Sequence, residues 1–339
     1  MLCVLLIAIT SCERRELEDV LINTAKIPVS FDWSQTGINP DNDENGDLYR
    51  GSIWLYCVDG TPFNGNSYKE YIINYPILDT IEVPVGKYKV LAINNAISDY
   101  SDNVVFKGTE NWESFEYSVK WSNKSNNSYM SEPDFLAIWL LDEFEVTAEM
   151  VLESSKGLNT IKSAASLQKM VGIQVVPIIY TCTVTAHVAH LRSAKSATGV
   201  FSGFASSVVL SSGEKKSEYD GYIFSFDRHK FYDPTSKDGY MQCSFVTLGK
   251  SQESSHNNEL SILFTLNETL DGSMLFPTPP NPPFRFDVSS QMGTDANRLN
   301  IEIEFGKIEL PDINAEGGFE PDIDDWGDED IIDIPINKM

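Results

Sequence analysis

The residues that come nearest to a metal-binding pattern lie in the stretch DNDENGD at positions 41–47. Asp41, Asp43 and Asn45 alternate and a glycine follows, as at the start of a calcium loop, where alternate oxygens ligate the ion. The twelfth position of that loop would be Ser52 instead of the bidentate glutamate. We therefore expect an ordinary turn before a strand. Calcium binding at Asp41, Asp43 and Asn45 is the alternative.

Catalytic motifs are missing from the sequence. His187 and His190 are three residues apart, so they could share a metal ion on a helix but not on a strand, where they face opposite sides. The alternation around them favours a strand, and we expect solvent-facing or turn histidines. No G-x-S-x-G, H-E-x-x-H, P-loop or G-x-G-x-x-G motif is present. The many carboxylates single out no glycosidase pair. We predict a protein that is not an enzyme and needs no cofactor.

The N-terminus carries a different kind of chemistry. Residues 2–10 are uncharged and mostly apolar, a length that fits a secretory signal and is too short to span a membrane. Residues 9–12, Ile-Thr-Ser-Cys, resemble the bacterial lipobox, whose cysteine is acylated, for example with palmitate. No Lys or Arg precedes Leu2, which departs from the usual signal. We predict a signal peptide at 1–11 and lipidation of Cys12; a buried N-terminal strand is the alternative.

The other cysteines do not form a recognisable site. If Cys3 leaves with the signal and Cys12 carries lipid, three of the five cysteines remain: Cys57, Cys182 and Cys243. Their number is odd and they lack C-x-x-C spacing, which argues against a zinc site or a disulfide scaffold. We expect Cys57 and Cys182 to be small buried side chains within strands. One disulfide in an oxidising compartment stays open.

Composition limits the class of partner. The net charge of −25 over 339 residues argues against nucleic-acid binding, which depends on clusters of Lys and Arg. It also argues against adhesion to an anionic membrane by charge, which leaves lipid as the link to a membrane. Hydrophobic residues make up 42% of the chain, as in folded proteins. The chain is long enough for two domains.

Alternation of apolar and polar residues dominates the chain and predicts an all-β fold. In TCTVTAHV (181–188) and LNIEIEF (299–305) every second residue is apolar. Similar strand-like runs are expected at 52–58, 87–93, 134–140, 206–212, 221–226 and 260–266. Turn-rich pieces separate these runs, as in sandwiches and barrels. A short helix is expected at 163–172, with Gly172 as its possible end.

The arrangement of these runs predicts two domains. Residues 151–172 lack a clear strand pattern and separate two strand-rich halves. We expect a tether at 12–26, an N-terminal β-sandwich at 27–150, a linker at 151–172 and a C-terminal β-sandwich with an acidic tail at 173–339.

The acidic tail contains a β-prone segment. Eleven carboxylates and no Lys or Arg lie between Glu309 and Asp333. Within the tail, IIDIPI (331–336) either completes the sheet of the second domain or forms an exposed pairing segment.

Aromatic residues offer a second binding hypothesis. Trp112 and Trp121 flank a polar loop region that includes Tyr129, and aromatic rings can stack on sugars. Trp54 and Trp139 lie within strand-like runs and are expected in the core. Trp112, Trp121 and Tyr129 are therefore the candidates for a glycan-binding surface.

Several stretches together resemble the fimbrillin-like surface lipoproteins of Gram-negative gut and oral anaerobes. They are the lipobox with IPVSFDW (27–33), VPVGKYKVLAINN (83–95) with Gly86, Tyr88 and Asn94, and, in the second half, residues 183–218, 284–292 and 301–311. The resemblance implies two tandem β-sandwich domains, transthyretin-like or immunoglobulin-like, and carries over Cys12 as the one functional residue.

This resemblance also implies a function. It suggests a lipid-anchored protein of the cell outer membrane that anchors or caps a fimbrium-like assembly or acts in cell adhesion. Its partners would be the membrane, through Cys12, and other fimbrial or surface subunits, bound largely through main-chain pairing. A glycan-binding surface lipoprotein that captures polysaccharide is the alternative.

Overall fold

The structure, a computed structural model, is built almost entirely from β-strands. It describes residues 23–36, 50–74, 78–124, 127–155, 170–217, 221–252, 258–267, 275–277, 282–292 and 298–312; the side chains of 121–124, 127–129 and 304–307 are outside this description. The described helices are α1 (Ala148–Ser155) and three 3-10 turns, η2 (Ile97–Asp99), η4 (Leu191–Ser193) and η5 (Ser289–Gln291). The predicted all-β class is confirmed. No helix in these ranges is long and apolar enough to cross a membrane.

The first half is built on a five-stranded antiparallel sheet. Its order is β13 (Val176–Pro177), β11 (Ala137–Val146), β6 (Gly86–Ile93), β3 (Arg50–Cys57) and β4 (Tyr68–Asn74). The antiparallel pair β1 (Thr24–Val29) and β5 (Asp79–Pro84) shares a buried apolar cluster with this sheet, and α1 lies against β1. The short strands β2 (Phe31–Asp32) and β12 (Ile173–Gln174) form a parallel pair. The start of the predicted linker is thus the helix α1, whereas residues 156–169 of the predicted helix and linker lie outside the described ranges.

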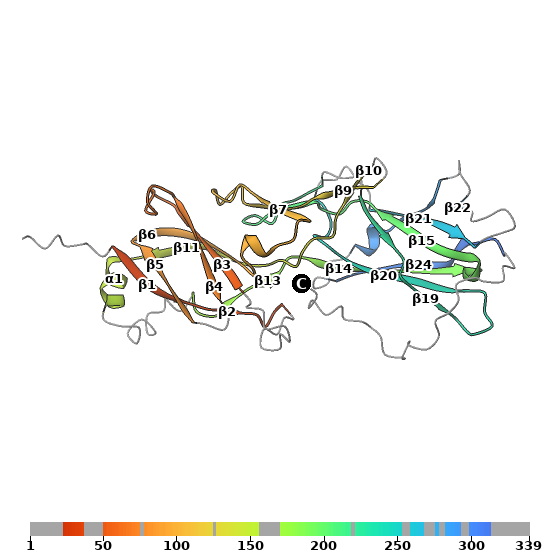
Figure 1. Cartoon of the computed structure of the whole chain (residues 1–339), viewed down its shortest axis with the longest axis horizontal. Helices are drawn as coiled ribbons and strands as arrows, with labels where there is room; N and C mark the ends of the chain where they lie inside the picture. The colour runs from red at the N-terminus through yellow and green to blue at the C-terminus, as the bar shows by residue number, and fades with distance from the viewer. Residues whose placement is uncertain are drawn as a thin grey trace, which may run out of the picture.

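Two further sheets, one of seven strands and one of four, lie mainly in the second half. One has the order β22 (Leu275–Phe276), β21 (Glu259–Leu266), β15 (Ala194–Phe201), β18 (Gly221–Ser225), β10 (Asn127–Met130) and β9 (Trp121–Lys124), and β23 (Phe284–Asp287) also pairs with β21. The other has the order β19 (Arg228–Phe231), β20 (Gly239–Thr247), β14 (Tyr180–Ala189) and β24 (Arg298–Glu309). Figure 1 shows the two halves end to end in an elongated molecule.

A fourth large sheet joins the halves. It has the order β17 (Lys215–Lys216), β16 (Ser207–Val209), β8 (Glu116–Val119) and β7 (Val104–Lys107), so strands from both halves of the sequence pair within it. Likewise β10, from the first half of the sequence, pairs with β18 in a sheet of the second half. Each half of the sequence therefore contributes strands to a sheet that also contains strands of the other half; we call these the exchanged strands.

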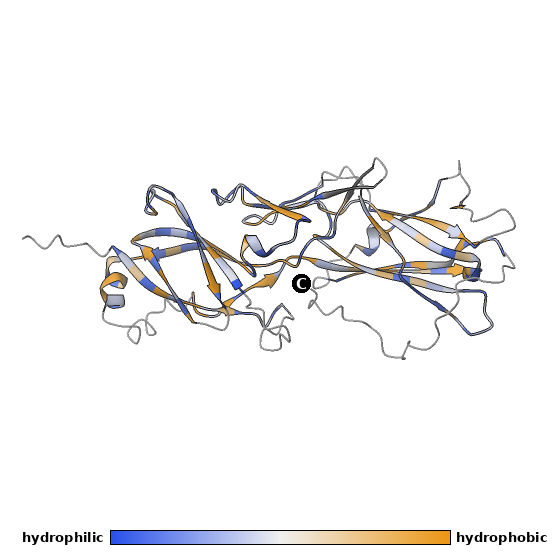
Figure 2. Ribbon diagram, viewed as in Figure 1, coloured by the Kyte–Doolittle hydropathy of each residue, from blue (hydrophilic) through white to orange (hydrophobic). Residues whose placement is uncertain are grey.

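Two separate clusters of buried apolar side chains stabilise the fold. The first extends from Ala25 to Ile179 and includes Val208 and Leu248 from further along the sequence; the second is formed by residues of 182–310 together with Met130. In β14 the burial alternates strictly, as the sequence predicts. Figure 2 shows apolar and polar residues interspersed along the strands of both halves. The division into two tandem domains with a boundary at 151–172 stays a prediction.

Candidate functional site

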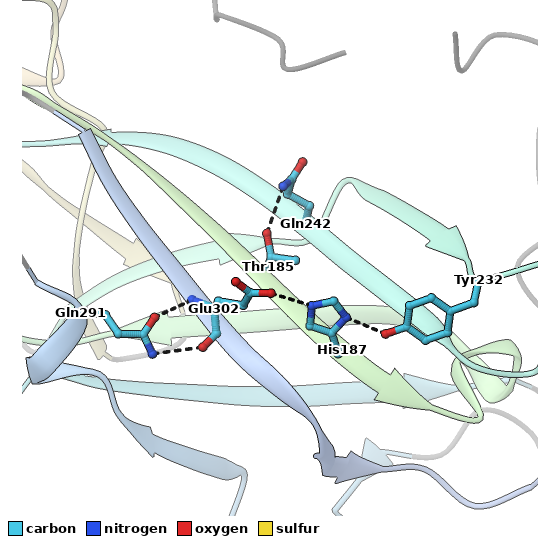
Figure 3. A network of polar contacts seen from close by, with 6 residues as sticks. All are labelled: Thr185, His187, Tyr232, Gln242, Gln291 and Glu302. Atoms are coloured by element: carbon cyan, nitrogen blue, oxygen red, sulfur yellow. Dashed lines mark hydrogen bonds and ion pairs between the residues drawn. The ribbon is translucent and has the colours of Figure 1, made fainter. Parts of the chain in front are cut away.

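The candidate site is a network of polar side chains on the outer face of the sheet β19–β20–β14–β24. Its members come from three of these strands, from the loop after β19 and from η5 (Figure 3). They are Thr185, His187, Tyr232, Gln242, Gln291 and Glu302. The strict alternation of β14 turns Cys182, Val184 and Ala186 into the core and leaves the intervening residues on this face.

His187 is the centre of the network. Its Nε2 lies 2.9 Å from Oε1 of Glu302, and its Nδ1 lies 2.6 Å from the hydroxyl of Tyr232. With the ring in its neutral form, Nε2–H donates to the Glu302 carboxylate, which can only accept, and Nδ1 accepts a hydrogen bond from the Tyr232 hydroxyl. The imidazole is thereby fixed in orientation between an acidic and a phenolic partner.

The position of Tyr232 is fixed by a tight loop between β19 and β20. The backbone N–H of Tyr232 donates to the carbonyl of Asp238 (3.2 Å), and Thr235 donates from its N–H to the Asp233 carboxylate (2.9 Å). The Tyr232 ring stacks on His187 with 6.1 Å between ring centroids and remains 50% exposed. Partial burial, followed by the negative charge of Asp238, raises the pKa of Tyr232, so its hydroxyl stays protonated at neutral pH.

Gln291 makes a different contact, to backbone instead of side chain. Its Nε2 donates to the carbonyl of Glu302 (3.0 Å), and the N–H of Glu302 donates to its Oε1 (2.6 Å). The turn η5 presents Gln291, because its neighbours Val288 and Met292 are buried in the second cluster. The side-chain amide thus occupies both hydrogen-bonding groups of one residue of β24.

Chemically, this surface can recognise polar ligands or peptide backbone. Thr185 accepts a hydrogen bond from Nε2 of Gln242 (3.0 Å), and 69% of the Glu302 side chain is exposed. No group of three or more His, Cys, Asp or Glu residues arranged for a metal ion occurs among the described residues. The network therefore offers donors, acceptors and one exposed carboxylate on an accessible sheet.

The two candidate histidines do not meet. His187 is on the open face of β14, as the alternation predicts, whereas His190 follows the strand with a left-handed φ of 56°. Nδ1 of His190 lies 2.8 Å from the carbonyl oxygen of Leu310. Sequence reasoning placed His187 on the exposed face but missed Tyr232, Gln291 and Glu302, because their partners lie far away in sequence.

The predicted lipid and calcium sites fall outside the described residues. Cys12 belongs to the undescribed range 1–22, and Asp41, Asp43 and Asn45 belong to 37–49. The tail segment 331–336 is also outside it. These assignments stay predictions.

The residues proposed for glycan binding do not form a described aromatic surface. Trp112 is only 8% exposed and packs edge-on against Tyr56, with 5.8 Å between ring centroids. Its burial differs from the exposed position that the glycan hypothesis requires, because a loop rich in aromatic residues folds back onto β3. Trp121 and Tyr129 lie in β9 and β10, where side chains are not described.

The three remaining cysteines are free thiols. Cys182 and Cys243 lie in the second cluster and Cys57 ends β3 in the first half. Burial raises the pKa of Cys182 and of Cys243 above the ordinary value of 9.0, so both stay neutral thiols. Cys182 and Cys243 are buried as small side chains, as predicted for Cys182. Cys57 was also predicted to be buried, but it is only partly buried, because it is the last residue of β3.

The structure defines an all-β protein in which strands from both halves of the sequence pair within common sheets. Residues 11–225 match the family described as a domain of unknown function (DUF5119), and the chain belongs to this family. No curated protein matches the sequence.

Solved structures extend the likeness over most of the chain. A candidate adhesin from Bacteroides ovatus is 15% identical, has a TM-score of 0.55, and is matched over 90% of this chain and 99% of its own. The fimbrial anchor protein Mfa2 from Porphyromonas gingivalis is 15% identical, with a TM-score of 0.44 over 82% of this chain and 90% of its own. A candidate polysaccharide-binding protein from Bacteroides thetaiotaomicron is 10% identical, with a TM-score of 0.42 over 84% of this chain and 93% of its own.

Proposed function

We propose that this chain is a non-enzymatic, lipid-anchored protein of the bacterial outer membrane, of fimbrial or adhesive type. The observation that carries the proposal is the match to the B. ovatus candidate adhesin, which covers 90% of this chain and 99% of that one. Such coverage means that the whole architecture is shared, including both halves. The elongated molecule and its exchanged strands suit a protein that bears load at a surface.

The anchor would be Cys12. It lies two residues after the apolar stretch 2–10 and is followed directly by charged chain, as expected where a signal is removed and lipid is attached. A single acyl chain binds a membrane only marginally, so stable anchoring needs the several chains that a bacterial lipoprotein carries. The partners would be other surface subunits. The glycan alternative gains no support from the buried Trp112.

Acylation is tested by expressing the chain in a Gram-negative host and feeding it a clickable fatty acid. Wild-type protein should be labelled and should sediment with the outer membrane. Cys12→Ala should lose the label and appear in the soluble fraction, whereas Cys3→Ala, in the same leader, should behave as wild type. Equal labelling and membrane retention of Cys12→Ala would contradict the proposed anchor.

A further inference from the structure

Two positive side chains of β19 lie on the outer face of the sheet β19–β20–β14–β24. β19 is at one edge of this sheet, and Arg228 lies across from Gln242 of the candidate network. Lys230, two residues further along the strand, points to the same face and is exposed. Neither side chain forms an ion pair with a described residue. β19 therefore presents two cations that no described carboxylate neutralises by direct contact.

The surroundings of β19 are slightly positive. Asp233 and Asp238, in the loop after the strand, each accept a hydrogen bond from a backbone N–H (2.9 and 2.8 Å). Residues 227–238 contain three Asp and three Lys or Arg, and Arg192 adds a fourth cation, 4.2 Å from the ring centroid of Phe231. This region differs from the whole chain, which has a net charge of −25.

The acidic tail leaves the described chain beside β19. Nζ of Lys237, in the loop between β19 and β20, lies 2.7 Å from both carboxylate oxygens of Asp312. Two residues earlier, the carbonyl oxygen of Leu310 lies 2.8 Å from Nδ1 of His190. Asp312 is the last described residue, so the tail begins next to the end of β19 with its first carboxylate already paired to a cation.

The tail has the charge and the length to reach the two free cations. Residues 313–330 contain eight Asp or Glu and no Lys or Arg. Eighteen extended residues reach up to about 60 Å, whereas the four residues of β19 span about 13 Å. Because the tail is attached at the end of the strand, its carboxylates are present near β19 at an effective concentration of about millimolar.

We propose that residues 313–330 fold back along β19 and pair their carboxylates with Arg228 and Lys230. The contact is made by side-chain charges and leaves β14 and β24 uncovered. An anionic partner reaches β19 only by displacing the tail, so the tail regulates access to this edge of the sheet. The proposal goes beyond the surface role proposed above and stands whether or not Cys12 is acylated.

Other placements of the tail are less favourable. On β24, at the opposite edge of the sheet, Arg298 and Glu302 point to the same face with opposite charges, so they offset each other. The tail of a second copy has the same carboxylates but is not attached beside β19, and two copies with a net charge of −25 each repel one another.

The first test maps contacts in the full chain carrying Cys12→Ala with a carbodiimide, which couples a carboxylate to an amine that it touches. Peptide mass spectrometry should find Lys230 coupled to one or more carboxylates of 313–330. Coupling of Lys237 to Asp312, a pair that the structure shows, is the internal control. Mixing nitrogen-15-labelled and unlabelled chains shows whether a coupled pair belongs to one molecule.

The second test measures how fast a glutamate-specific protease cuts the tail after Glu316 and Glu320. Arg228→Glu combined with Lys230→Glu should release the tail and make cleavage several-fold faster. Lys87→Glu combined with Lys120→Glu makes the same charge change at exposed positions of the first half and should leave the rate unchanged. Sodium chloride at 1 M should speed cleavage of the wild type relative to a free 313–330 peptide, because it shortens the screening length from about 10 Å at 0.1 M to about 3 Å.

Three results would overturn the proposal. The first is coupling of Lys237 to Asp312 without any coupling of Lys230 to 313–330. The second is equal cleavage of the two double variants, which would mean that the charges of β19 do not hold the tail. The third is coupling of Lys230 only between labelled and unlabelled chains, which would assign β19 to the tail of a second copy.

Discussion

The central sheets of the two halves are covered differently. In the first half, both faces of β3 are buried: Ile53 and Leu55 are 0% exposed on one face, and Trp54 and Tyr56 are 5% exposed on the other. In the second half, β14 is buried on one face only. The first sheet has no free face for a ligand around β3, whereas the second presents an accessible polar face with an open edge.

Aromatic side chains cover the second face of β3, and this is why the two sheets differ. The segment that carries β7 and β8 folds back over β3, and its Phe115 meets Trp54 edge-on with 5.1 Å between ring centroids. Tyr117 is 0% exposed and its hydroxyl donates to the carbonyl of Asp134 (2.9 Å). The comparison indicates that a ligand can reach the outer face of β14 but neither face of β3.

The largest effect is expected from cutting the chain between the halves. A chain that ends at Ile179 keeps most of the first cluster but lacks β16, which pairs with β8, and Val208, which is 2% exposed in that cluster. It should therefore lack the near-ultraviolet circular dichroism and cooperative melting of the full chain. A truncated chain that melts cooperatively like an independent domain would show that the exchanged strands are dispensable, as the simple two-sandwich prediction implies.

The next effect compares one residue from each sheet. Trp54→Ala removes a large side chain from the doubly covered sheet and should lower the free energy of unfolding by about 3–5 kcal/mol. Thr183→Ala, on the open face of β14, should cost about 1 kcal/mol or less. Denaturant unfolding measures both values. Similar losses for the two variants would mean that the faces are equally covered.

The smallest expected effect is on the pH dependence of stability, through the partly buried carboxylate of Glu70 in the first half. Burial raises the pKa of Glu70 above its ordinary value of 4.5, and the negative charge of Asp99 adds to this, against a hydrogen bond from Ser52. One Glu70 oxygen is buried without a partner in the described structure. A raised folded-state pKa means that the folded state binds the proton more tightly, so stability falls as pH rises from about 4.5 through the folded pKa.

Glu70→Gln removes this pH-dependent cost. The variant should melt at a higher temperature than wild type at pH 7, and the difference should shrink as the pH falls through 4.5 towards 4, where Glu70 becomes mostly protonated in both states. Glu113→Gln, at an exposed position, removes the same charge and is the control. A gain that is equal at pH 4 and pH 7 would argue against burial as its cause.

Local patterns predicted single strands well and long-range pairing poorly. The alternation of 181–188 and 299–305 identified β14 and β24, including their buried faces. A strand was predicted at 134–140, whereas the observed strand β11 begins and ends later, at Ala137–Val146. Its bounds are set by pairing with β6, which the local pattern does not reveal. The helix α1 was missed, since its eight residues lie against β1, which is distant in sequence.

The candidate site shows the same limit. His187 could be placed on an exposed face, because its neighbours alternate, but its partners Tyr232 and Glu302 are 45 and 115 residues away. Gln291 has no sequence signal, since its role depends on one turn meeting one edge strand. Trp112 was expected at the surface because its surroundings are polar, and it is buried because the loop folds onto β3.

Amide exchange of the free chain tests most directly whether the second half keeps an open edge while the first is closed. The backbone amides of Ile53 and Leu55 should exchange slowly. The amide of Ile301 should also exchange slowly, because its N–H points towards β14, with which β24 pairs. The amide of Asn300 should exchange much faster than that of Ile301. Its N–H points the same way as that of Glu302, two residues on, and therefore away from β14. Glu302 should be slow in the wild type, because Gln291 accepts its N–H, and fast in Gln291→Ala. An Asn300 amide as protected as that of Ile301 in the free chain would contradict the account, because the edge of β24 would already be occupied.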